Sequence, residues 1–513
     1  MITLVLITGV LISIAVFLYN QYVFHQRDIH EIALNQQSNI GQSRQEDETA
    51  VYRNNLVPIG MPLATGLSIR QGFKLRNGNL RDIWSVVMTQ KNHDARLRFI
   101  SADDDELVYD IDHLNGIFKR LVEYLESIGC KKIGIAVPVY TFHGFVTTMA
   151  CWSHGLTAYT FNRLPRTQCD VDVLIVDESQ LRFAEMFQYK KIIVVSKDQS
   201  AQYPSQDVVN WSSIGDLDSV RDDNYEYKYD PSYDDVIPLV DTFNFQSFSY
   251  THQNFVSSIA SIIRTLPLGQ EFGRETLLIG YEDSTINYWP KILAILLYGG
   301  SVIIGSTSNK SFSTAIETYS PTILSVDSTF ASGHFSSIVT KSQSTFQAWK
   351  LHRAIHLLSQ GVFSTNASLK EYENLRIVYV GSTSPDNELS SLQLTTMRAL
   401  FGCRVICERF LEGAIGAILS TNFYDYRVFS NDRLINRGTG SLSLELKLYK
   451  SGTYDISKRH GELCIRGFTI GRPVNQQDLA LAIERGERVG SEGWMPTRIT
   501  GKFGTDGCFY EDV

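Results

Sequence analysis

The sequence has little cysteine and no excess of positive charge, and both shortages exclude classes of protein. Seven cysteines are spread over 513 residues, so a small fold held together by disulfides is excluded and reduced thiols are expected. Lysine and arginine number 47 against 55 aspartate and glutamate, a formal net charge of −8, which gives a nucleic-acid partner no electrostatic support. The hydrophobic fraction of 43% excludes a mostly disordered chain.

Motifs for common site chemistries are also missing. The sequence has no Gly-x-Gly-x-x-Gly fingerprint, no phosphate-binding loop ending in Gly-Lys-Ser/Thr, and no His-Glu-x-x-His pair. Residues 381–385 come nearest to a Gly-x-Ser-x-Gly elbow and fail to match it. Cys403 and Cys407 are four residues apart without a second ligand pair, so we interpret them as core thiols. None of these patterns predicts a catalytic or metal-binding residue.

The first 19 residues carry no charged side chain. About 20 helical residues cross a hydrocarbon core of roughly 30 Å, so residues 1–22 are interpreted as a transmembrane anchor with Tyr19 and Tyr22 near the interface. A cleaved signal peptide and a buried core helix are the alternatives, although a basic start and a clear cleavage site are not seen. The lysine and arginine count after the segment favours a cytosolic body.

The sequence after the anchor divides into three regions that differ in polarity and hydrophobic periodicity. Residues 23–71 are interpreted as a polar tether and N-terminal extension. Residues 72–421 alternate helix-period segments with short runs of buried β-branched residues, which predicts an α/β fold with more than one parallel sheet covered on both faces. Residues 422–513 read as a small β-rich unit with glycine turns. The helix over 114–128 is the clearest, and the strand candidates are 131–139, 171–177, 190–196, 276–281, 301–306, 321–327 and 375–382.

The order of these segments resembles the adenylate-forming superfamily, and the long-chain acyl-CoA synthetases best. The sequence YTHQNF at 250–255 is similar to the "LTHxNF" that follows the family's phosphate loop, and Pro321-Thr322 stands at a recurrent "PT". LRIVYVGSTSP, GELCIRGF and GWMPTRITGKFGTDGCFY follow in the family's order and spacing. The resemblance implies two stacked βαβ-type subdomains and a small β-rich third subdomain.

The resemblance also implies a Gly/Ser/Thr-rich loop ending in lysine, which would bind the phosphates of ATP. That loop falls on residues 238–247, where bulky side chains such as Phe243 stand at glycine positions. Gln246 stands at the lysine position, and Asp241 would repel phosphate. We therefore expect this loop not to bind ATP.

Two further motifs of the family are altered. The Tyr-Gly-x-Thr-Glu motif, whose glutamate holds Mg²⁺, falls on 409–413, with Gly413 at the metal-ligand position and Glu412 one place before it. The Thr-Gly-Asp motif, whose aspartate binds the ribose hydroxyls, falls on 497–499, where Thr497 is retained and Ile499 replaces the aspartate. These changes predict that ATP and Mg²⁺ are not bound.

The family's fourth device is a C-terminal domain that supplies a catalytic lysine. The sequence ends where its hinge would begin, so we expect this domain to be absent. The sequence thus predicts a membrane-anchored, catalytically inactive acyl-CoA synthetase-like protein. It would act as a scaffold or regulatory subunit in lipid metabolism, held by a single span in the endoplasmic reticulum or a related membrane, with a lipid-metabolic enzyme as partner.

Two alternatives stay open at the level of sequence. The first is a fatty-acyl or lipid-binding protein without activation chemistry, because an acyl tunnel depends on apolar lining rather than on the altered motifs. The second is a divergent ATP-dependent long-chain fatty acid–CoA ligase that works with a partner's C-terminal domain.

Overall fold

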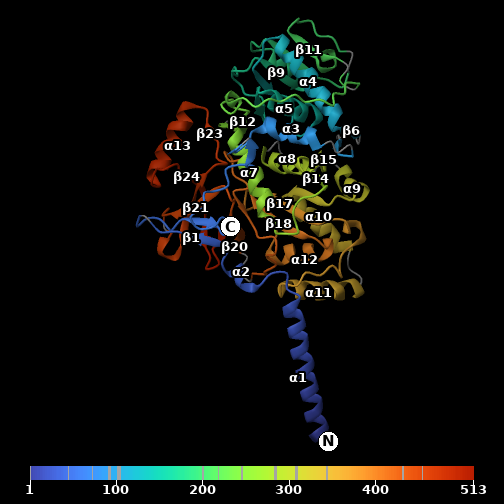
Figure 1. Cartoon of the computed structure of the whole chain (residues 1–513), viewed down its shortest axis with the longest axis vertical. Helices are drawn as coiled ribbons and strands as arrows, with labels where there is room; N and C mark the ends of the chain where they lie inside the picture. Colours follow the sequence, from blue (N-terminus) through green and yellow to red (C-terminus); the bar gives the residue numbers. More distant parts are fainter. Residues whose placement is uncertain are drawn as a thin grey trace.

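The computed structural model shows a tall two-sheet body standing on a long N-terminal helix (Figure 1). It describes residues 2–43, 45–71, 73–90, 94–100, 106–198, 201–215, 217, 219–243, 246–281, 286–306, 310–341, 345–386, 388–429, 433–452 and 454–513. The described residues form a sheet of eight strands, a sheet of fifteen strands and a two-stranded hairpin, β3 (Ile69–Gln71) with β4 (Lys74–Arg76). The α/β class predicted from the sequence is confirmed.

The upper sheet has the order β11-β10-β9-β7-β8-β12-β13-β23. Its strands from β11 to β12 run parallel, and β13 and β23 join antiparallel. Runs of buried β-branched residues such as VLIVD and KIIVV form its centre, as expected for parallel strands covered on both faces. The strands are β7 (Lys132–Ile135), β8 (Thr157–Phe161), β9 (Val173–Asp177), β10 (Lys191–Val195), β11 (Val208–Asn210), β12 (Leu239–Phe243), β13 (Gln246–Tyr250) and β23 (Arg472–Pro473).

The lower sheet has a parallel centre, β18-β17-β16-β14-β15-β5, with antiparallel strands added at both ends. All seven strand candidates from the sequence are confirmed in the two sheets. The parallel strands and the edge strand β6 are β5 (Arg96–Ile100), β6 (Glu106–Asp110), β14 (Thr276–Tyr281), β15 (Ser301–Ser306), β16 (Ile323–Asp327), β17 (Ile377–Ser382) and β18 (Arg404–Arg409).

Helices between the two sheets form the main core. The helices α3 (Leu80–Gln90), α5 (Phe142–His154), α7 (His252–Thr265) and α8 (Trp289–Leu297) lie between the sheets and contact one another (Figure 1). Trp152 of α5 and Trp289 of α8 are almost fully buried, and their ring centroids lie 4.7 Å apart. Helix α4 (Ile111–Ser127) packs against α5 and belongs to the same core. The helices on the outer faces are α6 (Leu181–Ala184), α9 (Lys310–Tyr319), α10 (Ser328–Lys341), α11 (Thr345–Ser359) and α12 (Ser391–Phe401).

The C-terminal region, predicted as a β-rich unit over 422–513, is joined to the lower sheet. Its strands continue the lower sheet, because β19 pairs with both β18 and β20, and it contains a helix, α13 (Gln476–Arg488). The strands are β19 (Leu419–Ser420), β20 (Leu434–Gly440), β21 (Leu444–Tyr449), β22 (His460–Gly467), β24 (Met495–Phe503) and β25 (Phe509–Asp512).

The segment 23–71, predicted as a tether, is in part packed into the body. It forms α2 (Glu31–Asn35), β1 (Ser38–Ile40) and β2 (Tyr52–Asn54), and β2 pairs with β21. The Tyr52 ring stacks on Phe503 at 3.7 Å between centroids, and the buried Glu48 carboxylate pairs with the Lys447 ammonium at 2.5 Å. Polar residues satisfied by such partners produce no apolar pattern, which is why the sequence suggested a tether.

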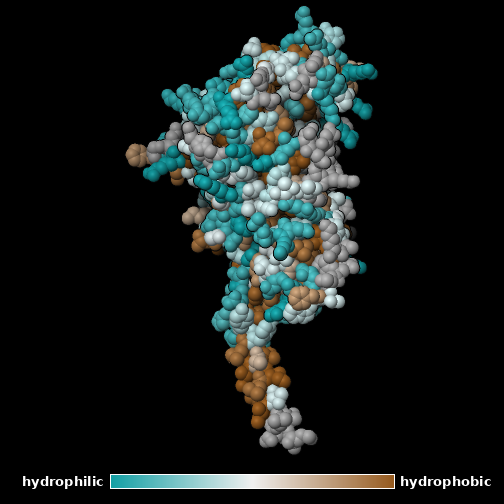
Figure 2. Space-filling model, turned by 90° about the vertical axis from the view of Figure 1, so that its right-hand side faces the viewer, coloured by the Kyte–Doolittle hydropathy of each residue, from teal (hydrophilic) through white to brown (hydrophobic). Residues whose placement is uncertain are grey.

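The N-terminal helix α1 (Ile2–His25) projects from the base of the body (Figure 1). Figure 2 shows it as an apolar rod beneath a largely polar surface. Its stretch Ile7–His25 is long and apolar enough to cross a membrane by length and composition, a test that a signal sequence also passes. The membrane anchor therefore stays a prediction.

Candidate functional site

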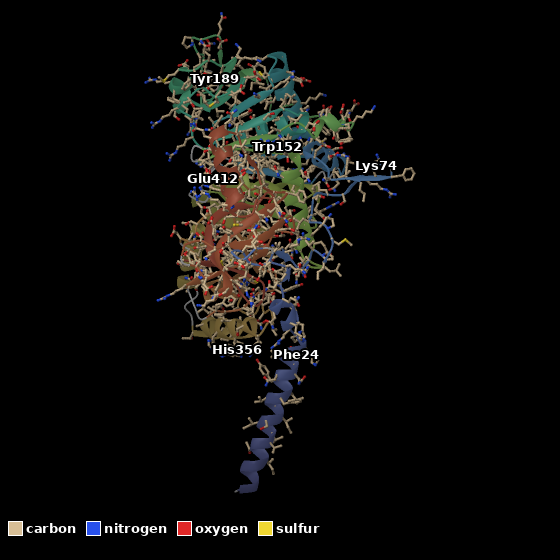
Figure 3. All side chains as sticks on the ribbon, turned by 90° about the vertical axis from the view of Figure 1, so that its left-hand side faces the viewer. Phe24, Lys74, Trp152, Tyr189, His356 and Glu412 are labelled. Atoms are coloured by element: carbon tan, nitrogen blue, oxygen red, sulfur yellow. The ribbon has the colours of Figure 1, made fainter. Side chains whose placement is uncertain are left out.

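A cavity of about 590 Å³ lies at the junction of the two sheets, where three parallel strands of the lower sheet end. Ligands of open α/β sheets bind outside the carboxyl ends of the strands, and the ends of β16, β17 and β18 open onto this cavity. Figure 3 places Glu412, at its edge, in the middle of the body. The lining residues that carry the argument are Asp241, Phe243, Asp327, Gly381, Asp386, Arg409, Phe410, Glu412, Gly413, Thr497, Arg498 and Ile499.

The structure brings six of the seven residues singled out from the motifs to this cavity, among them Asp241 and Phe243 of the predicted phosphate loop. Glu412, Gly413, Thr497 and Ile499 line it, although they come from two segments more than eighty positions apart. Gln246 does not line the cavity; it is exposed at the start of β13, opposite Phe243 in the antiparallel ladder. The resemblance therefore locates a common site, and the chemistry of that site depends on what each side chain does there.

Gly413 occupies a position that tolerates no side chain. Its φ is +85°, in the left-handed region that favours glycine. A Cβ atom there would lie 2.8 Å from the Phe248 ring. The Gly413 carbonyl accepts a hydrogen bond from the Gly471 N–H at 2.8 Å. A carboxylate ligand at this position is therefore excluded by both backbone conformation and packing.

Thr497 and Ile499 serve the fold of β24. The Thr497 hydroxyl donates to the Leu463 carbonyl at 2.7 Å and accepts from the Ile499 N–H at 3.1 Å. The Ile499 side chain is buried in an apolar cluster with Leu463 and Phe503. Neither side chain presents a hydrogen-bonding group that is free for a ribose.

Carboxyl groups give the cavity a negative character: Asp327 and Asp386 line it beside Asp241 and Glu412, and the last two show the effect of burial on the pKa. Asp241 is buried and accepts a hydrogen bond from the Thr160 hydroxyl at 2.5 Å. Burial raises the pKa of Asp241 to about 7; the hydrogen bond from Thr160 opposes this rise and the charge of Glu412 adds to it. Desolvation also raises the pKa of Glu412. Asp241 and Glu412 therefore lie where their charge is poorly compensated.

The cations of the cavity do not balance these carboxyls. Arg409 is buried, and its Nε and Nη2 donate to Glu511 at 3.0 and 2.8 Å. Its Nη1 faces the Ser382 and Phe410 carbonyls at 3.5 and 3.4 Å. Arg498 is exposed at the edge, with φ +64°. No lysine is found among the described lining residues, so Arg498 is the cation there that is not engaged by a carboxylate.

Aromatic and charged side chains fill the interior behind the cavity. The Phe410 ring lies against Gly381, where a Cβ atom would come within 2.3 Å of it. Behind it, the Lys291 ammonium of α8 pairs with the Glu408 carboxylate of β18 at 2.6 Å, with both side chains at most 4% exposed. The Lys291 ammonium also lies 5.2 Å from the centre of the Phe410 ring. This arrangement closes the space between α8 and β18.

The sequence reasoning missed the Lys291–Glu408 pair. The available signal was a single lysine in the apolar run WPKILAILL and a single glutamate in RVICER. A lone charge in a buried run requires a partner, because an unpaired buried charge is strongly disfavoured. The two positions are far apart in sequence, so only the fold shows that they pair.

Metal chemistry receives no support from the described residues. No group of three or more His, Cys, Asp or Glu side chains is placed among them to hold a metal ion. Cys403 and Cys407 are buried free thiols, and burial raises the pKa of both. Gly413 and Ile499 stand where the resemblance implies a metal ligand and a ribose ligand, and neither residue has a side chain that could coordinate a cation or bind a hydroxyl group.

Comparison with known structures shows the fold. A long-chain-fatty-acid–CoA ligase (FadD1) from Archaeoglobus fulgidus matches with a TM-score of 0.60 at 14% identity, covering 88% of this chain and 86% of that chain. The McyG A-PCP structure complexed with phenylalanyl-adenylate also gives 0.60, at 12% identity, with 88% and 77% covered. The anthranilate CoA ligase AuaEII, in complex with anthranoyl-AMP, gives 0.59 at 13% identity, with 85% and 76% covered.

Comparison of sequences gives a nearer relative. No protein-family model matches the chain. The uncharacterized protein YHR045W of Saccharomyces cerevisiae is 33% identical over 545 aligned positions, which cover 94% of both proteins. The chain therefore belongs to the family of YHR045W, and its fold is that of the adenylate-forming acyl-CoA ligase-like domains.

Proposed function

We propose that the chain is a membrane-anchored, non-adenylating protein on the acyl-CoA synthetase fold, acting as a scaffold or regulatory subunit in lipid metabolism. One observation carries the proposal. The cavity at the carboxyl ends of the central strands combines two poorly compensated carboxyls, Asp241 and Glu412, with a glycine and an isoleucine in place of the metal and ribose ligands.

The sizes of the competing interactions favour exclusion of a nucleoside triphosphate. A phosphate brought within about 4 Å of a like charge meets about 4 kcal/mol of repulsion at an effective dielectric constant near 20. One hydrogen bond to a charged group, the kind that Arg498 could offer, contributes about 1.5–3 kcal/mol. Loss of one preorganised electrostatic group typically lowers a rate by about 10²–10³, and several such groups are replaced here. The ionised carboxyls therefore oppose a phosphate in the cavity, and Arg498 offsets that repulsion only in part.

The membrane part of the proposal rests on α1. Its 24 residues extend about 36 Å at 1.5 Å per residue, enough for a hydrocarbon core of roughly 30 Å. Its outward side chains, among them Leu11, Phe17 and Leu18, are about 60% exposed, so the body does not cover them. We place the body on the cytosolic side and the span in the endoplasmic reticulum or a related membrane. Flotation with membranes and protection from protease test these placements.

The alternative of a fatty-acyl carrier is less favoured. An acyl chain would need an apolar cavity, whereas the cavity at the strand ends is lined in part by carboxyl groups. The space behind it is filled by the Lys291–Glu408 pair and packed aromatic rings. A ligase completed by a partner's C-terminal domain would still have to bind ATP in the carboxyl-lined cavity. The carrier predicts bound fatty acid, and the partner-dependent ligase predicts ATP-dependent activity when its partner is present; the proposal predicts neither.

The test is ATP–pyrophosphate exchange by the full chain, reconstituted in phospholipid nanodiscs, across fatty acids of different chain lengths. We expect exchange no faster than in empty nanodiscs, with an active fatty acid–CoA ligase as the positive control. Exchange that depends on a fatty acid would overturn the proposal. Exchange that appears only after a cell extract is added would identify the partner-dependent ligase instead.

A further inference from the structure

Helix α11 (Thr345–Ser359) has a composition that the proposed function does not use. Its sequence, TFQAWKLHRAIHLLS, has no acidic residue. It carries Lys350 and Arg353, two histidines, and two large aromatic side chains near its start. A basic helix with exposed aromatic residues is typical of helices that lie in the surface of a membrane.

The two faces of α11 differ. Ala354 and Leu358 are buried against the body. On the outward face Phe346 is 65% exposed and Trp349 is 57% exposed. The Lys350 ammonium lies 4.7 Å from the centre of the Phe346 ring. Cationic and aromatic groups thus share the outward face, which the described body leaves uncovered.

Helix α11 is joined to the end of α1. The N–H of Asp28 donates to the carbonyl of Gly361, just after α11, at 3.1 Å. The Asp28 carboxylate accepts from Arg404 at 2.7 Å and from the Tyr426 hydroxyl at 2.6 Å. The chain segment that leaves α1 is therefore fixed to the base of the body by backbone and ion-pair contacts.

The position of α11 matches the plane in which a membrane surface would lie. In two views related by a quarter turn, α11 lies at the base of the body and across the direction of α1 (Figures 1 and 3). His356 of α11 is at the same end of the body as Phe24 of α1 (Figure 3). The apolar stretch of α1 runs to His25, so the headgroups around it would lie at the level of α11.

We propose that α11 is an interfacial helix that rests on an anionic lipid surface beside the membrane-spanning α1. Tryptophan is enriched at membrane–water interfaces, and tryptophan and phenylalanine are typical of the side chains that interfacial helices bury at the headgroup boundary. Lysine and arginine are attracted to anionic lipids within a Debye length of the surface. The helix then fixes the tilt of the body, so that the cavity is held at a set height above the membrane. This inference rests on the anchoring part of the proposed function, not on the loss of catalysis.

The experiment uses the full chain in vesicles with a fluorophore at one cysteine. Cys169 is the native thiol that is not buried, so the labels are placed in a Cys169→Ser background. One label is attached to the cysteine of a Trp349→Cys variant. The matched control carries the label at Met186→Cys, because Met186 is 73% exposed. Tyr189, three positions further along the chain, lies at the end of the body opposite to α1 (Figure 3). Phosphatidylcholine vesicles, with and without phosphatidylserine, carry lipids with a doxyl quencher near the headgroup.

We expect several-fold stronger quenching at position 349 than at position 186, and stronger quenching at 349 when phosphatidylserine is present. The double variant Lys350→Glu with Arg353→Glu should lose the dependence on phosphatidylserine. Equal quenching at the two positions in chains that float with the vesicles would overturn the inference. Quenching at 349 that depends on neither lipid charge nor the two cations would overturn the assignment to an anionic surface. Chains that fail to float would instead overturn the anchor, and the helix assignment with it.

Discussion

Strand β18 and the loop that follows it are adjacent in sequence and opposite in character. Each of the charged side chains in β18 has a partner from a distant part of the chain: Arg404 pairs with Asp28, Glu408 with Lys291, and Arg409 with Glu511. In the loop, residues 410–413, the charge of Glu412 has no ion-pair partner among the described residues. The charged side chains of β18 stabilise the fold through ion pairs, whereas the Glu412 carboxylate of the loop lines the cavity.

The contrast shows that neighbouring charged residues can have different roles in this fold. Arg409 stands where the resemblance places the first position of a metal-binding motif, and it joins β18 to β25 through Glu511. Glu511 also binds Arg437 of β20 at 2.5 Å, and Arg437 reaches Glu388 at 2.9 Å. Arg409 lines the cavity, yet its guanidinium is held in a buried network of ion pairs. The following predictions test this division, from the largest expected effect to the smallest.

Replacing Glu511 with glutamine should be the most destabilising change. It removes the charge shared by Arg409 and Arg437, both buried, and breaking a buried ion pair costs roughly 3–5 kcal/mol. Glu511 pairs with both arginines, and Arg437 keeps Glu388 as a second partner while Arg409 loses its carboxylate, so we expect the upper end of that range. Thermal unfolding of the detergent-solubilised chain measures it. The control Glu484→Gln removes an exposed pair with Arg488 and should change stability by less than about 1 kcal/mol. Equal effects would contradict a structural role for the network.

Replacing Lys291 with methionine should destabilise the chain by roughly 3–5 kcal/mol, because it leaves Glu408 buried without its cation. Burial already raises the pKa of Glu408, and Lys291 opposes that rise. Adding Glu408→Leu should recover most of the loss, since a buried pair replaced by apolar residues is often neutral. Denaturant unfolding of the two single variants and the double variant measures the coupling. Additive losses would show that the two side chains do not act as a pair.

Replacing Asp241 with asparagine should stabilise the chain in a pH-dependent way. The pKa of Asp241 in the fold is about 7, above the ordinary value of 3.8, so ionisation opposes folding as the pH rises through this interval. The asparagine oxygen can still accept from Thr160. The variant should match the parent near pH 4 and exceed it above pH 7, by at most about 4 kcal/mol and less where solvent reaches the cavity. A difference that does not vary with pH would contradict the burial of this carboxyl.

Replacing Glu412 with glutamine should have the smallest effect on stability, within about 0.5 kcal/mol, because the side chain is exposed at the cavity edge. Its charge raises the pKa of Asp241, so its removal should shift the Asp241 titration to lower pH. Carbonyl infrared or NMR titration follows that shift. An unchanged Asp241 titration would show that the two carboxyls do not sense each other.

Much of the framework could be predicted from the sequence. Buried β-branched runs identified the parallel strands, although the predicted strand over 131–139 is longer than β7, which ends at Ile135. The strands β1 and β2 were not predicted, because each has three residues and their buried positions include polar side chains such as Ser38 and Asn54. Ser38 and Asn54 are held by hydrogen bonds to residues hundreds of positions away. Local pattern cannot report such contacts.

The position of the site could be predicted from the sequence, whereas the packing, hydrogen bonds and pKa values of its residues could not. Counting from motif anchors located Glu412, Gly413, Thr497 and Ile499, which the fold brings to one cavity. The reasons for those residues became visible only in three dimensions. Gly413 is required by its φ and by the Phe248 ring, and the Thr497 hydroxyl is engaged by backbone groups. The raised pKa of Asp241 likewise arises from burial, which sequence alone does not measure.

A direct measurement of ATP binding in the presence of Mg²⁺ tests the central claim, which is that this cavity does not bind a nucleoside triphosphate. The measurement is isothermal titration of the full chain in nanodiscs, across the range of roughly 1 μM to 1 mM in which enzymes commonly bind their substrates. The account predicts no saturable heat beyond that of empty nanodiscs. Saturable binding in this range that is weakened by bulk at the cavity wall, as in Thr383→Trp, would contradict it.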